Sequence, residues 1–214
     1  MEVALPLVIR ARVRSVLVRL VALTCLTMFV GTGAALADGT SGSCPSQPLS
    51  TPFAQWGDTN AYFLVPGGSF EGTSDQVGWT LNNASLTPGN EPWYVNSPTD
   101  DQSLTINGGG SATTPFFCVD NTMPDLRFFA QEVTAGSDLE VQAILQTAWG
   151  QISLPVADLS DGSMSSWAPT APIGVTTGPI PNGQSMQVAL EFSLPASSGA
   201  WQLDDVYFDP YRSG

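Results

Sequence analysis

The sequence contains no histidine and no lysine, and each absence excludes a class of function. Without histidine, the chain has no Ser-His-Asp or Cys-His catalytic group and offers no imidazole to a metal ion. Without lysine, it forms no Schiff base and has no phosphate-binding P-loop. Arginine is scarce as well, because the 214 residues contain six basic side chains against 19 acidic ones.

The first 37 residues have the three parts of a signal peptide. Four of the six arginines lie within residues 10–19, ahead of a mostly apolar run from Leu20 to Val30. That run is too short to span a bilayer, and Ala35-Leu36-Ala37 supplies a small-residue cleavage site. We therefore expect cleavage after Ala37 and a secreted, extracellular protein.

Removal of the signal peptide leaves an unusually acidic chain. It keeps 214 − 37 = 177 residues, the basic residues Arg127 and Arg212, and 19 − 1 = 18 acids, so its formal charge is 2 − 18 = −16. Two arginines neither neutralise a row of phosphates nor hold an anionic lipid surface. We therefore expect no nucleic-acid partner and no membrane partner after cleavage. A chain of this length suits one domain.

Cysteine usage predicts one disulfide. Cys25 lies in the apolar run and leaves with the signal, and the residues before it lack the pattern that precedes a lipidated cysteine. The remaining pair in an exported chain, Cys44 and Cys118, has one possible connectivity. In the chain-entropy model, closing so long a loop stabilises the fold by roughly 4 kcal/mol. A reactive thiol is disfavoured because no histidine or lysine is present to activate it.

The chain beyond the signal peptide shows no good helix, and short β-prone runs alternate with Gly and Pro turns. Apolar and polar residues alternate over Met186–Leu194, and similarly over 139–146. These patterns predict an all-β antiparallel sandwich over residues 61–214, preceded by an N-terminal arm over 38–60. A turn is expected from Asn107 to Gly110. The other expected strands are Ala61–Val65, Val77–Leu81, Ser103–Ile106, Thr114–Val119, Leu126–Gln131, Gln151–Pro155 and Gly199–Phe208.

The last expected strand carries an acidic residue on its apolar side. By period two, Asp204 shares the core-facing side with Val206 and Phe208, yet Leu203 should also be buried. Both hold only if a bulge lies near Leu203-Asp204. A buried carboxylate without a partner is costly, and a bound cation resolves that cost. The alternative is that Asp204 lies at the hydrated rim of the sheet, with its hydrogen bonds satisfied there.

Motifs at the two ends of the domain resemble a known family. The first are Pro66–Glu71 (PGGSFE) and Gly78–Leu81 (GWTL), and the last is Gly199–Phe208 (GAWQLDDVYF). Together they resemble the galactose-binding-domain-like jelly rolls, which include many bacterial carbohydrate-binding modules. The similarity covers roughly residues 61–209 and is more specific for the fold than for sugar binding. The chain also resembles small secreted actinobacterial proteins that consist of this domain alone and have no assigned activity.

The resemblance implies a structural calcium ion. In such jelly rolls, the Glu of the first motif and the first Asp of the last often help to hold calcium, and here these residues are Glu71 and Asp204. Calcium takes six to eight oxygen ligands, so loop carbonyls would complete the set. Asp205 is the less favoured ligand because it should point to the other face.

Aromatic residues are the candidates for sugar contact, because sugars stack on flat aromatic faces. Tryptophan in a β-sandwich is most often part of the core, and we expect that of Trp79 and Trp201. Trp93, Tyr94 and Trp149 lie in loop or hairpin settings. We therefore take these three as candidate carbohydrate-binding residues, with burial in the core as the alternative.

These observations favour a secreted, non-catalytic module that binds an extracellular carbohydrate. The alternative is a structural or protein-interaction module of the cell exterior without a sugar site. An enzyme is disfavoured, because glycoside hydrolysis needs two facing carboxyls. The adjacent pairs Asp100-Asp101 and Asp204-Asp205 should point to opposite faces of their strands.

Overall fold

The computed structural model describes residues 44–120, 125–175, 180, 184–195 and 199–209. The expected signal peptide and the start of the arm lie outside these ranges. Helical structure within them is limited to η1 (Ala54–Trp56) and α1 (Ser74–Val77). Neither is long and apolar enough to cross a membrane.

Antiparallel strands make up most of the rest. Their bounds are β1 Phe63–Leu64, β2 Thr80–Pro88, β3 Gln102–Thr113, β4 Phe117–Asp120, β5 Asp125–Thr134, β6 Leu139–Thr147, β7 Gly150–Leu159, β8 Ala168–Pro169, β9 Ile173–Gly174, β10 Ser185–Ser193 and β11 Ala200–Phe208.

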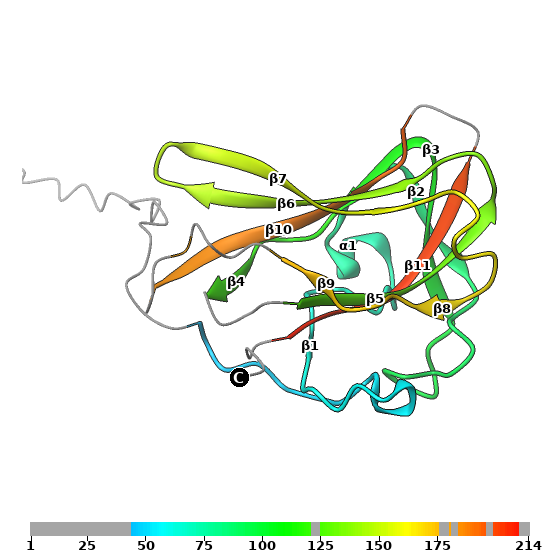
Figure 1. Ribbon diagram of the computed structural model, residues 1–214, viewed down its shortest axis with the longest axis horizontal. Helices are drawn as coiled ribbons and strands as arrows, with labels where there is room; N and C mark the ends of the chain where they lie inside the picture. Colours follow the sequence, from blue (N-terminus) through cyan, green and yellow to red (C-terminus); the bar gives the residue numbers. More distant parts are fainter. Residues whose placement is uncertain (1–43, 121–124, 176–179, 181–183, 196–198, 210–214) are drawn as a thin grey trace, which may run out of the picture. The chain divides into compact units, whose positions relative to one another are not determined.

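The strands form one sheet that curls into two facing layers (Figure 1). The main order is β7-β6-β10-β3-β11-β5-β8, while β2 pairs with β3, β4 with β10, β1 with β11 and β9 with β5. In Figure 1, β7, β6 and β10 lie in the upper layer and β11, β5 and β1 in the lower one. This architecture confirms the predicted all-β sandwich of jelly-roll type.

Strand β3 belongs to both layers and turns between them at three glycines. Leu104–Asn107 pairs with β11, whereas Ser111–Thr113 pairs with β10. A Cβ at Gly110 would lie 2.6 Å from the backbone carbonyl oxygen of Asn83, so only glycine fits there. The predicted turn at Asn107–Gly110 is therefore wrong, because these glycines bend a continuous strand.

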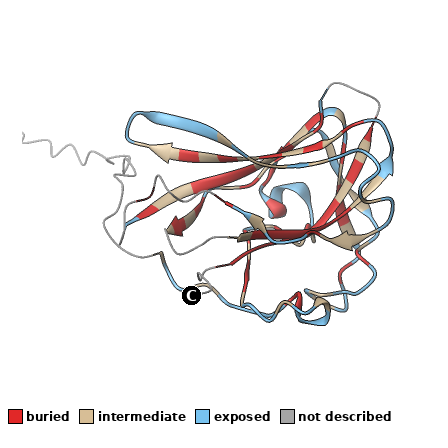
Figure 2. Ribbon diagram, viewed as in Figure 1, coloured by how far each residue is buried: buried red, intermediate tan, exposed pale blue. Residues whose placement is uncertain are grey.

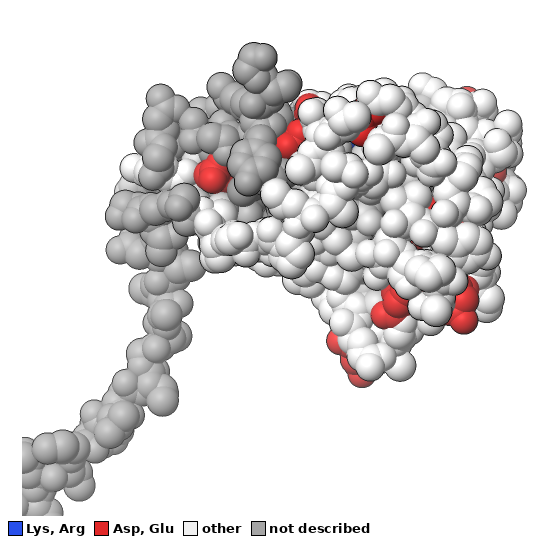
Figure 3. Space-filling view, turned by 90° about the horizontal axis from the view of Figure 1, so that it is seen from below, with Lys and Arg blue, Asp and Glu red and all other residues white. Residues whose placement is uncertain are grey.

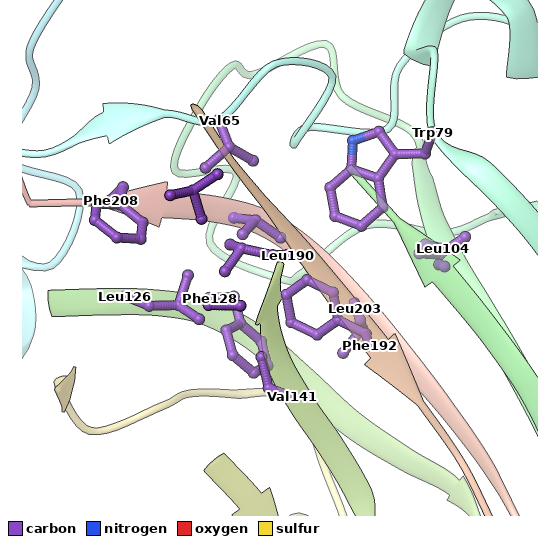
Figure 4. Packing of buried hydrophobic residues seen from close by; sticks show 14 of the residues in the cluster. Val65, Trp79, Leu104, Leu126, Phe128, Val141, Leu190, Phe192, Leu203 and Phe208 are labelled. Carbon is purple, nitrogen blue, oxygen red and sulfur yellow. The ribbon is translucent and has the colours of Figure 1, made fainter. Parts of the chain in front are cut away.

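The core fills the space between the layers, where the buried stripes of the strands face one another (Figure 2). Phe192 lies at its centre (Figure 4), edge-on to Phe128 at 5.2 Å and stacked with Trp79 at 5.7 Å between ring centroids. Trp79 and Trp201 are both buried in this cluster, as the sequence predicted. The alternation in β10 that produced the prediction points Leu190 and Phe192 inward.

The predicted disulfide between Cys44 and Cys118 is confirmed, with the two Cα atoms 5.5 Å apart. It joins the beginning of the described arm to β4. Farther along, Ser50 and Tyr62 form an isolated antiparallel bridge. The arm is therefore held to the domain at two points, Cys44 and Ser50.

We expect Phe192→Ala to lower the free energy of unfolding by about 4 kcal/mol, because it leaves a cavity between the layers. Urea denaturation followed by circular dichroism measures the loss. The matched control is Phe116→Ala, because this ring is 41% exposed. Equal losses in the two variants would show that Phe192 does not pack as described.

Candidate binding face

Arg127 ties the N-terminal arm to the lower layer. Its Nη1 lies 2.6 Å from Oδ2 of Asp58, and its Nε and Nη2 donate to the carbonyl oxygen of Thr170 at 2.9 and 2.6 Å. The guanidinium carbon lies 4.0 Å from the ring centroid of Phe53. Burial raises the pKa of Asp58, but hydrogen bonds from the Tyr62 hydroxyl and Arg127 outweigh it and lower the pKa below its usual value. Arg127 is the sole basic residue in the described ranges.

The arm covers a second aromatic cluster on the outer face of β5 and β11. Phe129 and Tyr207 form its base, and Phe53 and Tyr62 pack on them. Trp56 of the arm lies 5.3 Å from Phe129 between ring centroids. This cluster is separate from the core between the layers, and it fixes where the arm lies.

Three tryptophans pack against the aromatic cluster that contains Phe129. Trp93, from the β2–β3 loop, lies 5.7 Å from Phe129 and edge-on to Trp56 at 5.0 Å. Trp167, from the segment before β8, packs against the same cluster. All three are partly exposed, Trp93 by 38%. The result is a rim of accessible tryptophan edges.

A row of amides and hydroxyls lies beside these tryptophans. Gln131, Gln202 and Thr105 are register partners on β5, β11 and β3. Gln131 donates to Gln202 at 2.5 Å, Gln202 donates to Thr87 at 3.3 Å, and the Thr87 and Thr105 hydroxyls are 2.8 Å apart. Because Gln131 is two residues from Phe129, the row lies about 6.6 Å from the aromatic cluster along the strand.

We call this surface the amide–tryptophan face; its residues are Trp56, Trp93, Trp167, Gln131, Gln202, Thr87 and Thr105. Each of them is at least partly exposed. Trp93 and Tyr94 were expected to contact sugar, whereas Trp56, Trp167 and the two glutamines were not singled out. Period-two alternation in the predicted strands indicates that Gln131 and Gln202 face outward. Trp56 and Trp167 lie outside the predicted strands, so no alternation indicates whether they are exposed.

Buried carboxylates hold the loop that carries Trp93 and Tyr94. The Glu91 carboxylate accepts hydrogen bonds from the backbone N–H groups of Trp93 and Val95. The N–H of Glu91 itself donates to Asp204 Oδ2 at 2.9 Å, and that of Asn96 to Asp205 Oδ2 at 3.1 Å. A loop N–H group needs an acceptor, and these carboxyl oxygens supply one to each of four loop residues, so the acids position the loop.

A bulge in β11 places the two aspartates, as the sequence predicted. The register against β5 shifts between Asp204 and Tyr207, and Asp205 has a positive φ of 47°. Leu203 and Val206 therefore both reach the core. The expectation that Asp204 shares the side of Val206 is wrong, because the bulge comes one residue later. Asp204 instead lies on the outer face, buried beneath the loop.

Burial and neighbouring acids raise the pKa values of Asp204 and Asp205 far above the ordinary value for aspartate. Burial, and then the charge of Asp205, raise the pKa of Asp204 to about 9. Burial, and then the charges of Glu91 and Asp100, raise the pKa of Asp205 to about 8. Asp205 is fully buried, and its Oδ1 has no hydrogen-bond partner. Such a group favours protons or a bound cation.

The two expected metal ligands, Glu71 and Asp204, accept hydrogen bonds from different backbone segments. Glu71 Oε1 accepts hydrogen bonds from the N–H groups of Asp101 and Gln102 at 2.9 and 3.0 Å. The charge of Glu71 contributes to the raised pKa of Asp205, while the oxygens of Asp204 accept from the N–H groups of Glu91 and Asp205. No three acidic or cysteine side chains of the described ranges are placed to hold a metal ion by themselves. The buried, unpartnered Asp205 oxygen is chemically suited to a hard cation, which prefers oxygen ligands.

Trp149 lies apart from the other two predicted aromatics. It is 98% exposed at the tip of the β6–β7 hairpin. In Figure 1 that tip and the β2–β3 loop lie at opposite ends of the fold. Trp93 and Tyr94 share one loop, so the three candidates do not make a single platform.

Two grooves of about 400 and 390 Å³ lie along β7, and the first is lined by Glu140 and Asp158 among others. These two residues are register partners in one hairpin and stand side by side. Seen from below, the described surface shows acidic side chains in separate groups and no basic one (Figure 3).

No model of a protein family and no curated protein matches the sequence. Solved carbohydrate-binding modules do match the fold. The tandem CBM22-1-CBM22-2 domains of Paenibacillus barcinonensis Xyn10C give a TM-score of 0.50 at 14% identity, covering 80% of this chain and 49% of that one. The single CBM22-1 xylan-binding domain of that protein gives 0.46 at 15%, covering 69% and 94%. A family 16 carbohydrate-binding module gives 0.44 at 17%, covering 68% and 98%. The chain therefore has the jelly-roll fold of carbohydrate-binding modules.

We expect Arg127→Leu to lower the free energy of unfolding by about 3 kcal/mol, because it leaves the Asp58 carboxylate without its cation. Thermal denaturation measures the loss. The double variant Arg127→Leu/Asp58→Asn should recover part of it, since the unpaired charge is then gone. Strictly additive losses would show that the two side chains do not act on each other.

We expect the stability of the protein in chelator to fall as the pH rises from 5 to 8. Asp204 and Asp205 keep their protons in the folded chain up to about pH 9 and 8, but lose them near pH 3.8, the ordinary pKa of aspartate, when unfolded. The folded state then binds more protons, so the free energy of unfolding declines by up to about 1.4 kcal/mol per pH unit for each carboxyl. Thermal denaturation at four pH values measures the slope.

The control is the double variant Asp204→Asn/Asp205→Asn, which should show a flatter pH dependence because neither side chain titrates. Saturating calcium should flatten the wild-type dependence if a cation replaces the protons. A stability that rises from pH 5 to 8 in chelator would contradict the assignment of protons to these carboxyls.

Proposed function

We propose that the protein is a non-catalytic module that binds an uncharged extracellular polysaccharide on the amide–tryptophan face. One observation carries the proposal: a row of Gln131, Gln202 and Thr105 lies two residues along the strand from the Phe129 cluster, on which three partly exposed tryptophans pack. A sugar ring presents both C–H faces and hydroxyls. This face offers a partner for each of them.

The chemistry of the face suits sugar hydroxyls. An amide side chain both donates and accepts hydrogen bonds, as a hydroxyl does. Trp93 and Trp167 offer flat apolar surface to the C–H groups. The acidic composition disfavours an anionic polysaccharide, and the one cation of the described ranges, Arg127, is buried beneath the arm. The ligand class is therefore a neutral glycan.

Several features support a binding role rather than catalysis. The buried acids Glu91, Asp204 and Asp205 accept hydrogen bonds from loop N–H groups and line neither groove along β7. The N-terminal signal pattern supports secretion. A structural calcium beside Glu71 and Asp205, with Asp204 close by, belongs to the same proposal. It would neutralise the acids that hold the Trp93 loop.

Affinity electrophoresis against soluble xylan, β-1,4-galactan, mannan and β-glucan tests the proposal, followed by calorimetry on whichever retards the protein. We expect Trp93→Ala, and likewise Gln131→Ala/Gln202→Ala, to weaken binding about tenfold or more, equivalent to about 1.4 kcal/mol. The matched control is Gln187→Ala, a glutamine on β10 in the other layer. A folded protein that none of these polysaccharides retards would overturn the proposal and favour a protein-interaction module.

A further inference from the structure

The tip of the β6–β7 hairpin presents Trp149 with its backbone held firmly. The Thr147 hydroxyl donates to the carbonyl oxygen of Gly150 at 2.6 Å and accepts from the N–H of Trp149 at 3.2 Å. The side chain is nevertheless 98% exposed. Within the described residues nothing covers this ring, and tryptophan is enriched at binding interfaces because it joins a large apolar surface to a polar N–H.

The residues beside Trp149 repeat the chemistry of the amide–tryptophan face. Gln146 and Gln151 are register partners, and Gln151 donates to Gln146 at 3.1 Å. Both belong to the hairpin that carries the tryptophan. A tryptophan beside a hydrogen-bonded amide pair thus occurs a second time in the molecule.

The hairpin is also free of charge. From residue 141 to residue 157 the sequence contains no acidic or basic side chain, although the whole chain has a net charge of −13. Glu140 and Asp158 bound this stretch at its far end from the tip. A lipid surface usually needs basic side chains as well as an apolar tip, and this hairpin has none. The neutral, amide-rich surroundings favour a neutral glycan instead.

The two surfaces cannot contact the same sugar. The hairpin belongs to the layer of β6, β7 and β10, whereas the amide–tryptophan face is the outer side of β5 and β11. Outer faces of a sandwich point away from each other, and Figure 1 places the hairpin tip and the β2–β3 loop at opposite ends. Occupation of both sites therefore requires two chains or two distant parts of one chain.

We propose that Trp149, Gln146 and Gln151 form a second carbohydrate site, which makes the protein bivalent and able to bridge polysaccharide chains. The inference rests on the proposed function for its ligand class. Two weak sites acting together raise the apparent affinity for a polymer by roughly 10²–10⁴ over either alone. Bridging adds a property that one site lacks, because it joins chains into a network.

The test uses the full chain and the soluble polysaccharide that retards it most, beginning with xylan. Light scattering should rise at intermediate ratios of protein to polysaccharide and fall again when protein is in excess. Trp149→Ala should abolish that rise, while a short oligosaccharide of the same sugar still binds the amide–tryptophan face within about threefold of wild type. Phe116→Ala, an exposed aromatic outside both sites, should scatter like wild type.

Other outcomes separate the second site from the proposed function. Equal scattering by wild type and Trp149→Ala would overturn the second site and leave the proposed function standing. Binding lost in Trp149→Ala but unaffected by Gln131→Ala/Gln202→Ala would support the hairpin site and overturn the amide–tryptophan face. The wild type could instead dimerise without polysaccharide or float with phosphatidylcholine vesicles. If Trp149→Ala abolished that dimerisation or flotation, the second carbohydrate site would be overturned. No retardation by any polysaccharide would overturn both.

Discussion

The Arg127 guanidinium joins three parts of the chain that are far apart in sequence. It forms an ion pair with Asp58 of the arm, lies over the ring of Phe53, and donates two hydrogen bonds to the carbonyl oxygen of Thr170 beside β8. Trp56 and Trp167 belong to the two segments that it draws together. The arrangement of the amide–tryptophan face therefore depends on one buried cation in an acidic protein.

The acids of β11 organise the other side of the same face. A loop without regular structure needs acceptors for its N–H groups, and Asp204 and Asp205 provide them because the bulge leaves both beneath the loop. Burying these carboxylates costs stability unless they hold protons or a cation. The position of Trp93 is thus linked to the ionisation of residues that lie more than a hundred positions later in the sequence.

Much of the fold follows from local pattern, and much of the site does not. The alternation in β6 and β10 identifies strands and their inner faces, and the two remaining cysteines identify the disulfide. The bulge was predicted because Leu203 and Val206 must both be buried, but nothing local distinguishes Asp204 from Asp205 as the extra residue. The Trp93 loop is held by acceptors distant in sequence, and the arm that carries Trp56 is held by Arg127 through Asp58 and Phe53. The periodicity of apolar residues carries no information on these long-range contacts, so the sequence pattern alone did not predict the amide–tryptophan face.

The disulfide has a mechanical consequence. Tension applied through the residues before Cys44 enters the domain at Cys118, and so passes by a covalent bond into β4 and its neighbour β10. The segment from residue 45 to Trp56 lies outside that line of force. A chain pulled at its N-terminal side would load the sheet, and the aromatic rings of the arm would keep their places.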